Sequence, residues 1–239
     1  MADPVVHGEV EGAGGGVNWL VDFFGNAANW SGPDGIPLRV LEHLVFAGLS
    51  LLLAVVLAVP LGLWIGHTGK GAVLVVLSAN AARALPTLGL LVLVVLLMGV
   101  GTLAPVLIPL VALAVPPILV NTYEGIRGVD PELRDAAYGM GLRGRQVLGG
   151  VLVPVALPLI LLGMRTAAIQ VVATATVAAY VGLGGLGRYI IDGLATKDYP
   201  RAIGGAVLVA ALALAVQGLF ALVQRVTVSP GVSGRQRIR

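Results

Sequence analysis

Long apolar runs without charged residues constrain this chain more than any other feature of its sequence. Residues 44–65, 103–120 and 202–223 contain no Asp, Glu, Lys or Arg. About 20 such residues are enough to cross the hydrocarbon core of a bilayer as an α-helix. A helix also satisfies its own backbone hydrogen bonds, which lipid cannot do. The sequence therefore predicts an all-α membrane protein.

Two longer apolar stretches complete the predicted bundle. Residues 72–100 contain one charge, Arg83, and predict a single second span over 73–98 that bends at Pro86. Residues 151–181 are apolar over most of their length and contain the predicted fourth span. With the three uncharged runs as spans one, three and five, the chain is expected to cross the membrane five times.

The overall composition agrees with a lipid environment and excludes several kinds of site. The chain is 57% hydrophobic and only 11% charged, against about 25% charged in an average soluble protein. It contains no cysteine, which excludes disulfides and thiolate chemistry. Its three histidines, His7, His43 and His67, lack the spacing of metal ligands. We therefore expect no metal and no cofactor in this chain, and its net charge of only +3 gives no reason to expect a nucleic-acid partner.

The distribution of basic residues predicts the orientation of the chain. With the N-terminus outside, the cytoplasmic segments hold Lys70, Arg127, Arg134, Arg143, Arg145, Arg225, Arg235, Arg237 and Arg239, and the outer segments hold only Arg39, Arg188, Lys197 and Arg201. Cytoplasmic loops carry the excess of Lys and Arg, so we predict an outer N-terminus and an inner C-terminus. The chain then divides into an extracytoplasmic leader and interfacial segment (1–43), a transmembrane domain (44–224) and a cytoplasmic tail (225–239).

We expect no cleavable signal peptide in the leader, because its first residues are acidic and lack a basic segment followed by an apolar one. Trp19, Phe23, Phe24 and Trp30 lie close together ahead of the first span. Aromatic residues gather where lipid meets water, so an interfacial helix is expected here. The alternative is a disordered leader.

The segment 121–154 is the polar connection between the third and fourth spans. Asp130-Pro131-Glu132 is a favourable helix start, with proline in the first turn beside an acidic side chain. Gly139 and Gly141 then break the helix before it resumes. A helix–turn–helix on the cytoplasmic face has no role in lipid, so the pattern predicts a docking element for a soluble partner.

The spacing of residues in this segment resembles a known loop. Asp135-Ala136-Ala137 is followed after three residues by Gly141, after nine more by Val151, and after one more by Val153-Pro154. This resembles the EAA loop of permeases from bacterial binding-protein-dependent ABC importers. The chain further resembles permeases for quaternary-ammonium osmoprotectants in three runs of residues. These runs are NTYEGIRGVDPELRDAAYGMG, LPLILLGMRTAAIQVVATATVAAYVGLGGLG and WSGPDGIPLRVLEH.

The resemblance implies a five-span ABC-importer permease core, multi-pass in the bacterial cytoplasmic membrane, with a cytoplasmic coupling helix. The implied partners are two ATPase subunits that hold ATP and Mg, a second permease chain of the same or similar sequence, and an extracytoplasmic substrate-binding protein. The implied ATPase-coupling residues are Asp135, Ala136, Ala137, Gly139, Gly141, Arg143, Arg145 and Pro154. The alternative is that these glycines only form the turn and the arginines only set orientation.

Polar side chains inside apolar stretches are candidates for a translocation pathway. They are Asn80, Arg83, Thr87, Arg165, Gln170 and Thr174. Charged residues within spans usually face the bundle interior or a watery path. The alternatives are that the polar groups form hydrogen bonds between helices and that both arginines extend to the cytoplasmic interface.

A second glycine cluster follows the fourth span. Gly182, Gly184, Gly185 and Gly187 match the GxGxxG spacing, but no strand precedes them and no acidic residue follows at the required distance, so a dinucleotide site is not expected. Their resemblance to the same loop in the permeases predicts an external gate.

The sequence contains no P-loop and no paired catalytic residues, so we predict a non-enzymatic subunit that depends on a separate ATPase. No aromatic cage for a quaternary ammonium is visible, which favours solute selection by a separate binding protein. The alternatives are an ABC permease for an amino acid or similar solute, and a stand-alone secondary carrier.

Overall fold

The computed structural model describes residues 14–84 and 86–228, and every regular element in them is helical. The first half comprises α1 (Gly14–Gly25), η1 (Ala27–Trp30), α2 (Ile36–Thr68), α3 (Ala72–Ala84), α4 (Thr87–Met98) and α5 (Ala104–Arg127). The second half comprises α6 (Pro131–Gly139), α7 (Gly144–Val147), η2 (Leu148–Leu152), α8 (Val153–Thr174), η3 (Ala175–Val181), α9 (Gly187–Thr196) and α10 (Tyr199–Thr227).

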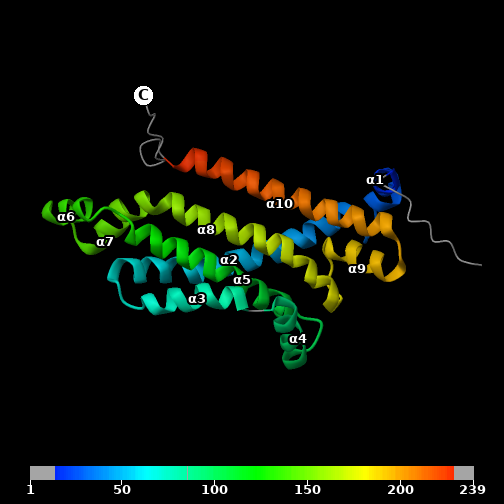
Figure 1. The fold of residues 1–239 in the computed structure, drawn as a ribbon, viewed down its shortest axis with the longest axis horizontal. Helices are drawn as coiled ribbons and strands as arrows, with labels where there is room; N and C mark the ends of the chain where they lie inside the picture. The colour runs from blue at the N-terminus through cyan, green and yellow to red at the C-terminus, as the bar shows by residue number, and fades with distance from the viewer. Residues whose placement is uncertain (1–13, 85, 229–239) are drawn as a thin grey trace, which may run out of the picture.

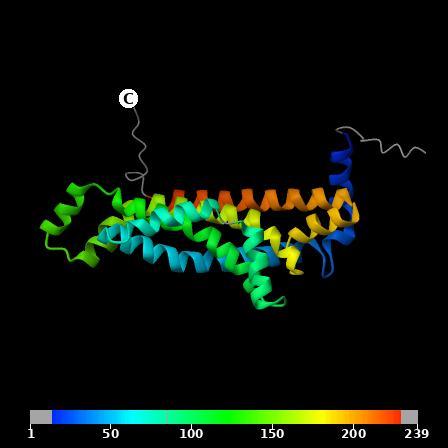
Figure 2. The same cartoon turned by 60° about the horizontal axis from the view of Figure 1, so that its bottom comes forward.

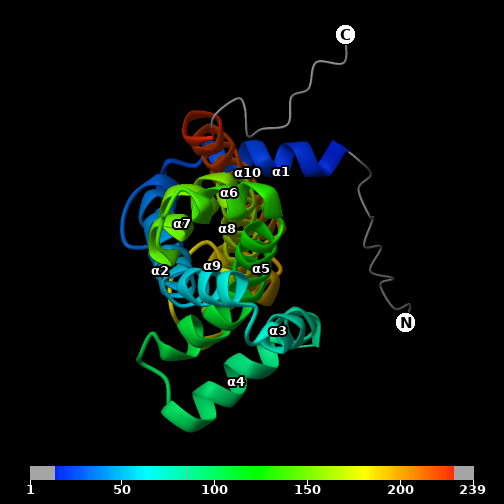
Figure 3. The ribbon, with the colours of Figure 1, turned by 90° about the vertical axis from the view of Figure 1, so that its left-hand side faces the viewer.

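The long helices lie side by side in one elongated bundle (Figure 1). Helices α6 and α7 form one end of the bundle, which we call the α6 end, and α1 and α9 lie at the opposite, α9 end. Viewed along the bundle, α5 and α8 lie centrally, with α2 and α10 beside them (Figure 3). Four apolar helical runs in the described residues are long enough to cross a membrane: Ile36–Thr68, Ala104–Arg127, Gly144–Val181 and Tyr199–Thr227. This confirms the predicted all-α membrane architecture.

Small residues bring the central helices into close contact. The buried face of α2 presents a ladder of small side chains four residues apart: Ser50, Ala54, Ala58, Gly62 and Gly66. A Cβ added at Gly62 would lie 2.7 Å from Cβ of Thr122, and one added at Gly66 would lie 2.8 Å from Cβ of Ile126, both on α5. In lipid, helices associate through such close approach because no hydrophobic force drives them together.

The order of these contacts fixes the direction of the chain. Position 62 of α2 meets position 122 of α5, and position 66 meets position 126, so α2 and α5 run in the same direction. The chain must therefore return to the α9 end between them, and α3 and α4 make that return. Gly163 of α8 meets Pro117 and Ile118 of α5, whereas Gly125 of α5 meets Ala156 of α8, so α5 and α8 are antiparallel.

The second predicted span differs from the prediction. No continuous helix covers 73–98, because α3 ends at Ala84 and α4 begins at Thr87 with Pro86 as its N-cap. Proline lacks the N–H of a helical residue, and its ring clashes with the preceding turn, so the predicted bend is a break. Helix α4 leaves the bundle at a steep angle (Figure 2). Helices of 13 and 12 residues are each too short to cross a bilayer alone.

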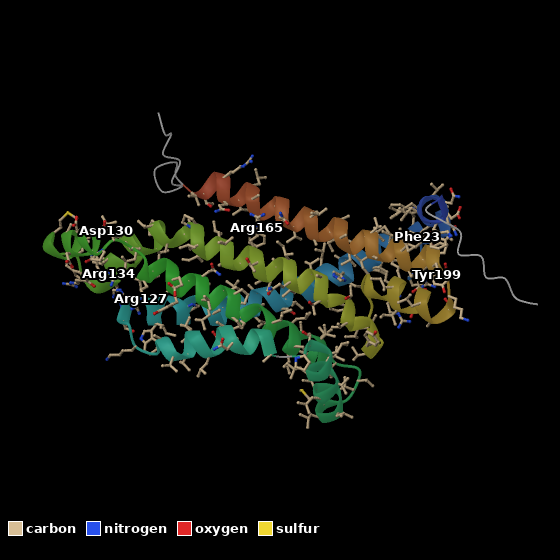
Figure 4. All side chains as sticks on the ribbon, viewed as in Figure 1. Phe23, Arg127, Asp130, Arg134, Arg165 and Tyr199 are labelled. Atoms are coloured by element: carbon tan, nitrogen blue, oxygen red, sulfur yellow. The ribbon has the colours of Figure 1, made fainter. Side chains whose placement is uncertain are left out.

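The leader packs against the bundle as a helix. The ring of Phe23, which is buried, meets the ring of Tyr189 edge-on with 5.4 Å between centroids. Trp19 stacks on Tyr199 at 5.8 Å, and Figure 4 shows Phe23 and Tyr199 at the same end of the molecule. Residues 14–25 and 27–30 are therefore helical and pack against α9 and α10, while their place at the membrane interface stays a prediction. Helix α2 begins at Ile36, ahead of the predicted start of the first span at residue 44.

Candidate functional site

Local sequence signals build the helix–turn–helix at the α6 end. The N–H of Glu132 donates to Oδ1 of Asp130 at 2.9 Å, which caps α6 as the sequence predicts. Gly141 has φ 83°, a left-handed conformation that favours glycine and turns the chain out of α6. The Arg143 N–H donates to the side-chain oxygen of Gln146 at 2.8 Å and starts α7. The predicted helix, turn and resumed helix are all present.

Ala137 differs from the other predicted coupling residues because its side chain is buried inside the chain itself. It packs in a cluster with Ile126 of α5, Val147 of α7 and Leu152 of η2. Position 137 therefore anchors α6 to the bundle and does not present a side chain to a partner. A larger side chain there would displace α6 from α5.

The remaining predicted coupling residues lie on the open surface of this end. Asp135, Ala136, Gly139, Gly141, Arg143, Arg145 and Pro154 are all exposed. Three large apolar side chains accompany them, since Leu133, Tyr138 and Met140 are 43%, 43% and 75% exposed. The sequence prediction missed these three, although apolar residues within a polar segment are a recognisable signal of a docking surface. We call the exposed residues of 133–145 the coupling surface.

Both sides of the coupling surface are attached to long helices. Nη2 of Arg134 donates to the carbonyl of Ile126 at 3.2 Å, which ties α6 to the last turn of α5. Figure 4 shows Arg134 on α6 and Asp130 just before it, beyond Arg127 at the end of α5. On the other side, α7 continues through the π-helix η2 directly into α8. A force applied to this surface would therefore reach α5 and α8 together.

The predicted external gate lies at the α9 end, opposite the coupling surface (Figure 1). A Cβ added at Gly184 would lie 1.9 Å from Oε2 of Glu42, and one added at Gly187 would lie 2.1 Å from the carbonyl oxygen of Thr176. Gly182 and Gly185 have φ of 76° and 87°. Gly182 and Gly185 are thus favoured by backbone conformation and Gly187 by close packing against backbone, whereas Gly184 meets only the ends of the flexible Glu42 and Arg39 side chains.

A cavity of about 370 Å³ is lined by residues of α1, η1, α9 and α10 and of the turns that precede α2 and α10. Asp22, Asp34 and Asp198 contribute carboxylates and Arg201 contributes a guanidinium. The hydroxyl of Tyr189 also lines the cavity and donates to the carbonyl of Asp34. Burial raises the pKa of this hydroxyl, so it stays protonated and keeps the hydrogen bond at neutral pH.

The predicted pathway residues fall into two groups. Arg165 and Thr174 are half-buried and Gln170 is exposed, all on α8, and Figure 4 shows Arg165 between the two ends of the molecule. Asn80 is exposed on α3 and Thr87 is half-buried at the start of α4. Arg83 belongs to α3, but its side chain lies outside what the structure describes. Among the described side chains, no hydrogen bond or ion pair joins the α8 group to the α3–α4 group.

Comparison with known proteins shows which protein family shares this sequence. Residues 58–233 match the family described as binding-protein-dependent transport system inner membrane component. The chain belongs to this family. It is accordingly a multi-pass transport protein of the bacterial inner membrane, as predicted, and it carries the fold of ABC-importer permeases.

Individual relatives within this permease family are similar over most of their length. The glycine betaine/carnitine/choline transport system permease protein OpuCB of Bacillus subtilis is 36% identical over 197 residues, covering 82% of this chain and 90% of the relative. The carnitine transport permease protein OpuCB of Listeria monocytogenes is 38% identical over 181 residues, covering 76% and 82%. Among solved structures, the MetNI methionine ABC transporter in an inward-facing conformation has a TM-score of 0.69 at 23% identity, covering 80% of this chain and 95% of that one, which shows a shared fold.

Proposed function

We propose that this permease is the membrane subunit of an ATP-driven importer for osmoprotectants such as glycine betaine, choline or carnitine. The observation that carries the proposal is the coupling surface, which is exposed at one end of the bundle and attached to both α5 and α8. The choice of solute is supported by the relatives that are 36% to 38% identical, which are named as permeases for glycine betaine, carnitine and choline and for carnitine.

In this proposal the coupling surface sits in a groove of a cytoplasmic ATPase. Met140 and Tyr138 supply apolar contacts, and Arg143 and Arg145 supply charge. The backbone of Gly139 and Gly141 permits close approach to the partner. Each ATPase subunit would engage one permease chain, so the complete importer holds two permeases, two ATPases with their ATP and Mg, and an extracytoplasmic binding protein. This chain performs no hydrolysis of its own.

The proposed topology has five crossings, with α3 and α4 together forming the second. It is supported by the parallel directions of α2 and α5, which require a return between them. It is also supported by the charge distribution, since the segment from α6 to α7 carries Arg134, Arg143 and Arg145 and would lie on the cytoplasmic side. The N-terminal helix α1 and the glycine loop would then face outside.

The proposed pathway runs along the less buried face of α8, where Thr166, Gln170 and Thr174 recur at four-residue intervals. Arg165 lies at the edge of this face, where its guanidinium could pair with the carboxylate of a betaine. Asn80, Arg83 and Thr87 would contribute to the pathway from α3 and α4. A second permease chain would cover this face and complete the path.

Uptake into proteoliposomes tests the proposal. The permease, co-purified with its ATPase, is reconstituted with binding protein outside and ATP inside, and uptake of labelled glycine betaine, choline, carnitine and proline is measured. The proposal predicts uptake of at least one quaternary ammonium solute that requires ATP and binding protein together. Uptake by this chain without ATP would overturn it in favour of a carrier, and uptake of proline alone would favour an amino-acid importer.

A further inference from the structure

We propose that Arg39, Glu42 and His43, all in the first two turns of α2, form an outer latch. The latch holds the glycine loop (residues 182–187) and the outer end of α8 against α2, and it is released during each import cycle. The inference rests on the proposed import function, because only a transporter needs this end of the bundle to open and close.

Glu42 makes the direct contact with the loop. Its Oε2 accepts the backbone N–H of Gly185 at 2.7 Å, across 143 residues of sequence. The same oxygen would lie 1.9 Å from a Cβ at Gly184, so the carboxylate occupies the space that a side chain would fill. The carboxylate therefore lies directly against the backbone of the loop. A charge-assisted hydrogen bond of this kind is stronger than one between neutral groups.

Arg39 holds Glu42 in position. Its Nη1 donates to the same Oε2 at 2.8 Å, and its Nη2 pairs with Asp34 in the turn before α2. The Arg39 side chain is only 14% exposed, so this ion pair is partly shielded from water. The Glu42 side chain is 30% exposed, and Arg39 is the cation that pairs with it among the described residues. Loss of Arg39 would therefore remove this ion pair and free the Glu42 carboxylate to move away from the loop.

His43 holds the end of α8 that leads into the loop. Its imidazole is fully buried, and Nε2 lies 2.8 Å from the carbonyl oxygen of Val172. Because a carbonyl oxygen can only accept, Nε2 carries the hydrogen and donates it. Adjacent residues of α2 thus hold two separate points: the outer end of α8 through His43 and the glycine loop through Glu42.

The latch lies at the far end of a single helical run that begins in the coupling surface. Helices α7, η2, α8 and η3 follow one another from Gly144 to Val181 without a break. This run contains a π-helix near its inner end and a 3-10 helix near its outer end, where helical pitch changes. Movement of α7 would therefore pull on the residues that His43 and Glu42 hold, so ATPase closure would release the latch.

Labelling of the loop tests the latch without requiring transport. The chain has no cysteine, so the Leu183→Cys variant offers a single thiol at a half-buried position of the loop. In the permease co-purified with its ATPase, with no nucleotide added, we measure the rate of labelling by a membrane-impermeant maleimide. In this background Glu42→Ala and Arg39→Gln should raise the rate about tenfold, the change expected when one charge-assisted hydrogen bond is lost. Glu42→Gln, whose amide oxygen can still accept from Gly185, should give a smaller rise.

The matched control is Arg188→Gln, which removes a guanidinium from the same end of the molecule. Arg188 pairs with Asp192 within α9 at 3.1 Å and lies outside the latch. The Arg188→Gln variant should therefore be labelled at the same rate as the parent protein. Equal rates in the Arg39→Gln, Glu42→Gln and parent proteins would overturn the latch, even if Glu42→Ala fails to fold. Failure of ATP-dependent uptake in the parent would count against the import function, while the labelling comparison would still decide whether the loop is latched.

Discussion

At the scale of single residues, glycine has two different structural roles in this permease. Gly62 and Gly66 allow α2 to approach α5 so closely that a Cβ at either position would meet another side chain within 3 Å. Gly48, on the same helix, has nothing within 4 Å of the position that a Cβ would occupy. The role of a glycine in this bundle therefore depends on which face of its helix it occupies.

This contrast predicts opposite effects of one substitution. Gly62→Ala should lower the stability of the folded permease by about 1–3 kcal/mol, because the added methyl group overpacks the contact with Thr122. Gly48→Ala should leave stability unchanged or raise it by about 0.5–1 kcal/mol, since alanine is the better helix former. Thermal unfolding of the two variants in the same detergent measures the difference. Equal midpoints for both would show that the α2–α5 contact is looser than described.

At the scale of elements, the attachment of α6 to α5 by Arg134 predicts a defect in coupling. Arg134→Met keeps the aliphatic length of the side chain but loses the hydrogen bond to the Ile126 carbonyl, a loss of about 1.5–3 kcal/mol for a charged donor. We expect solute uptake to fall while ATP hydrolysis continues, because α6 would move without pulling α5. The readout is solute taken up per ATP hydrolysed in proteoliposomes.

Arg127→Met is the control for this variant. Arg127 donates to the hydroxyl of Tyr123 at 2.6 Å, a contact within α5 itself. Its loss leaves α6 attached, so the ratio of uptake to hydrolysis should be retained. A fall of equal size in both variants would mean that the end of α5 is generally sensitive and that Arg134 has no special part.

Elements with local signals were predictable from sequence, and those set by distant contacts were not. The cap at Asp130 and the turn at Gly141 depend on neighbouring residues, so the helix–turn–helix was predicted correctly. The inward direction of Ala137 is set by Ile126 and Val147, which no local pattern reveals. The break at Pro86 was predicted only as a bend, because sequence alone does not show whether a proline in an apolar run kinks a helix or ends it.

Side-chain contacts across the bundle leave no local pattern in the sequence for the same reason. The glycine loop was recognised from its spacing, but its partner Glu42 lies 143 residues away from Gly185. The exposed Leu133 and Met140 carried a signal that could have been used, since apolar residues stand out in a polar segment. Polarity alone marks the candidate pathway residues in the sequence, and they lie on three helices, α3, α4 and α8.

At the scale of the whole molecule, the proposed topology predicts which positions face which side. Asn26 and Lys197 are exposed at the α9 end, and Met140 is exposed at the α6 end. In intact cells, Asn26→Cys and Lys197→Cys should react with an impermeant maleimide added outside. Met140→Cys, in the permease expressed without its ATPase, should react only after permeabilisation. Labelling of Met140→Cys from outside would mean that the chain has the opposite orientation to the one proposed.

The central claim is that the coupling surface transmits the movement of a partner ATPase to the bundle. Its most direct test is solute imported per ATP hydrolysed, in proteoliposomes that contain permease, ATPase and binding protein, for the parent and for Gly141→Asp. Gly141 has φ 83° and lies on the exposed turn, so a side chain there strains the backbone and projects into the partner. Gly218→Ala, in open space on α10, serves as the control. The account predicts that the ratio collapses in Gly141→Asp alone, and a ratio equal to that of the parent would contradict it.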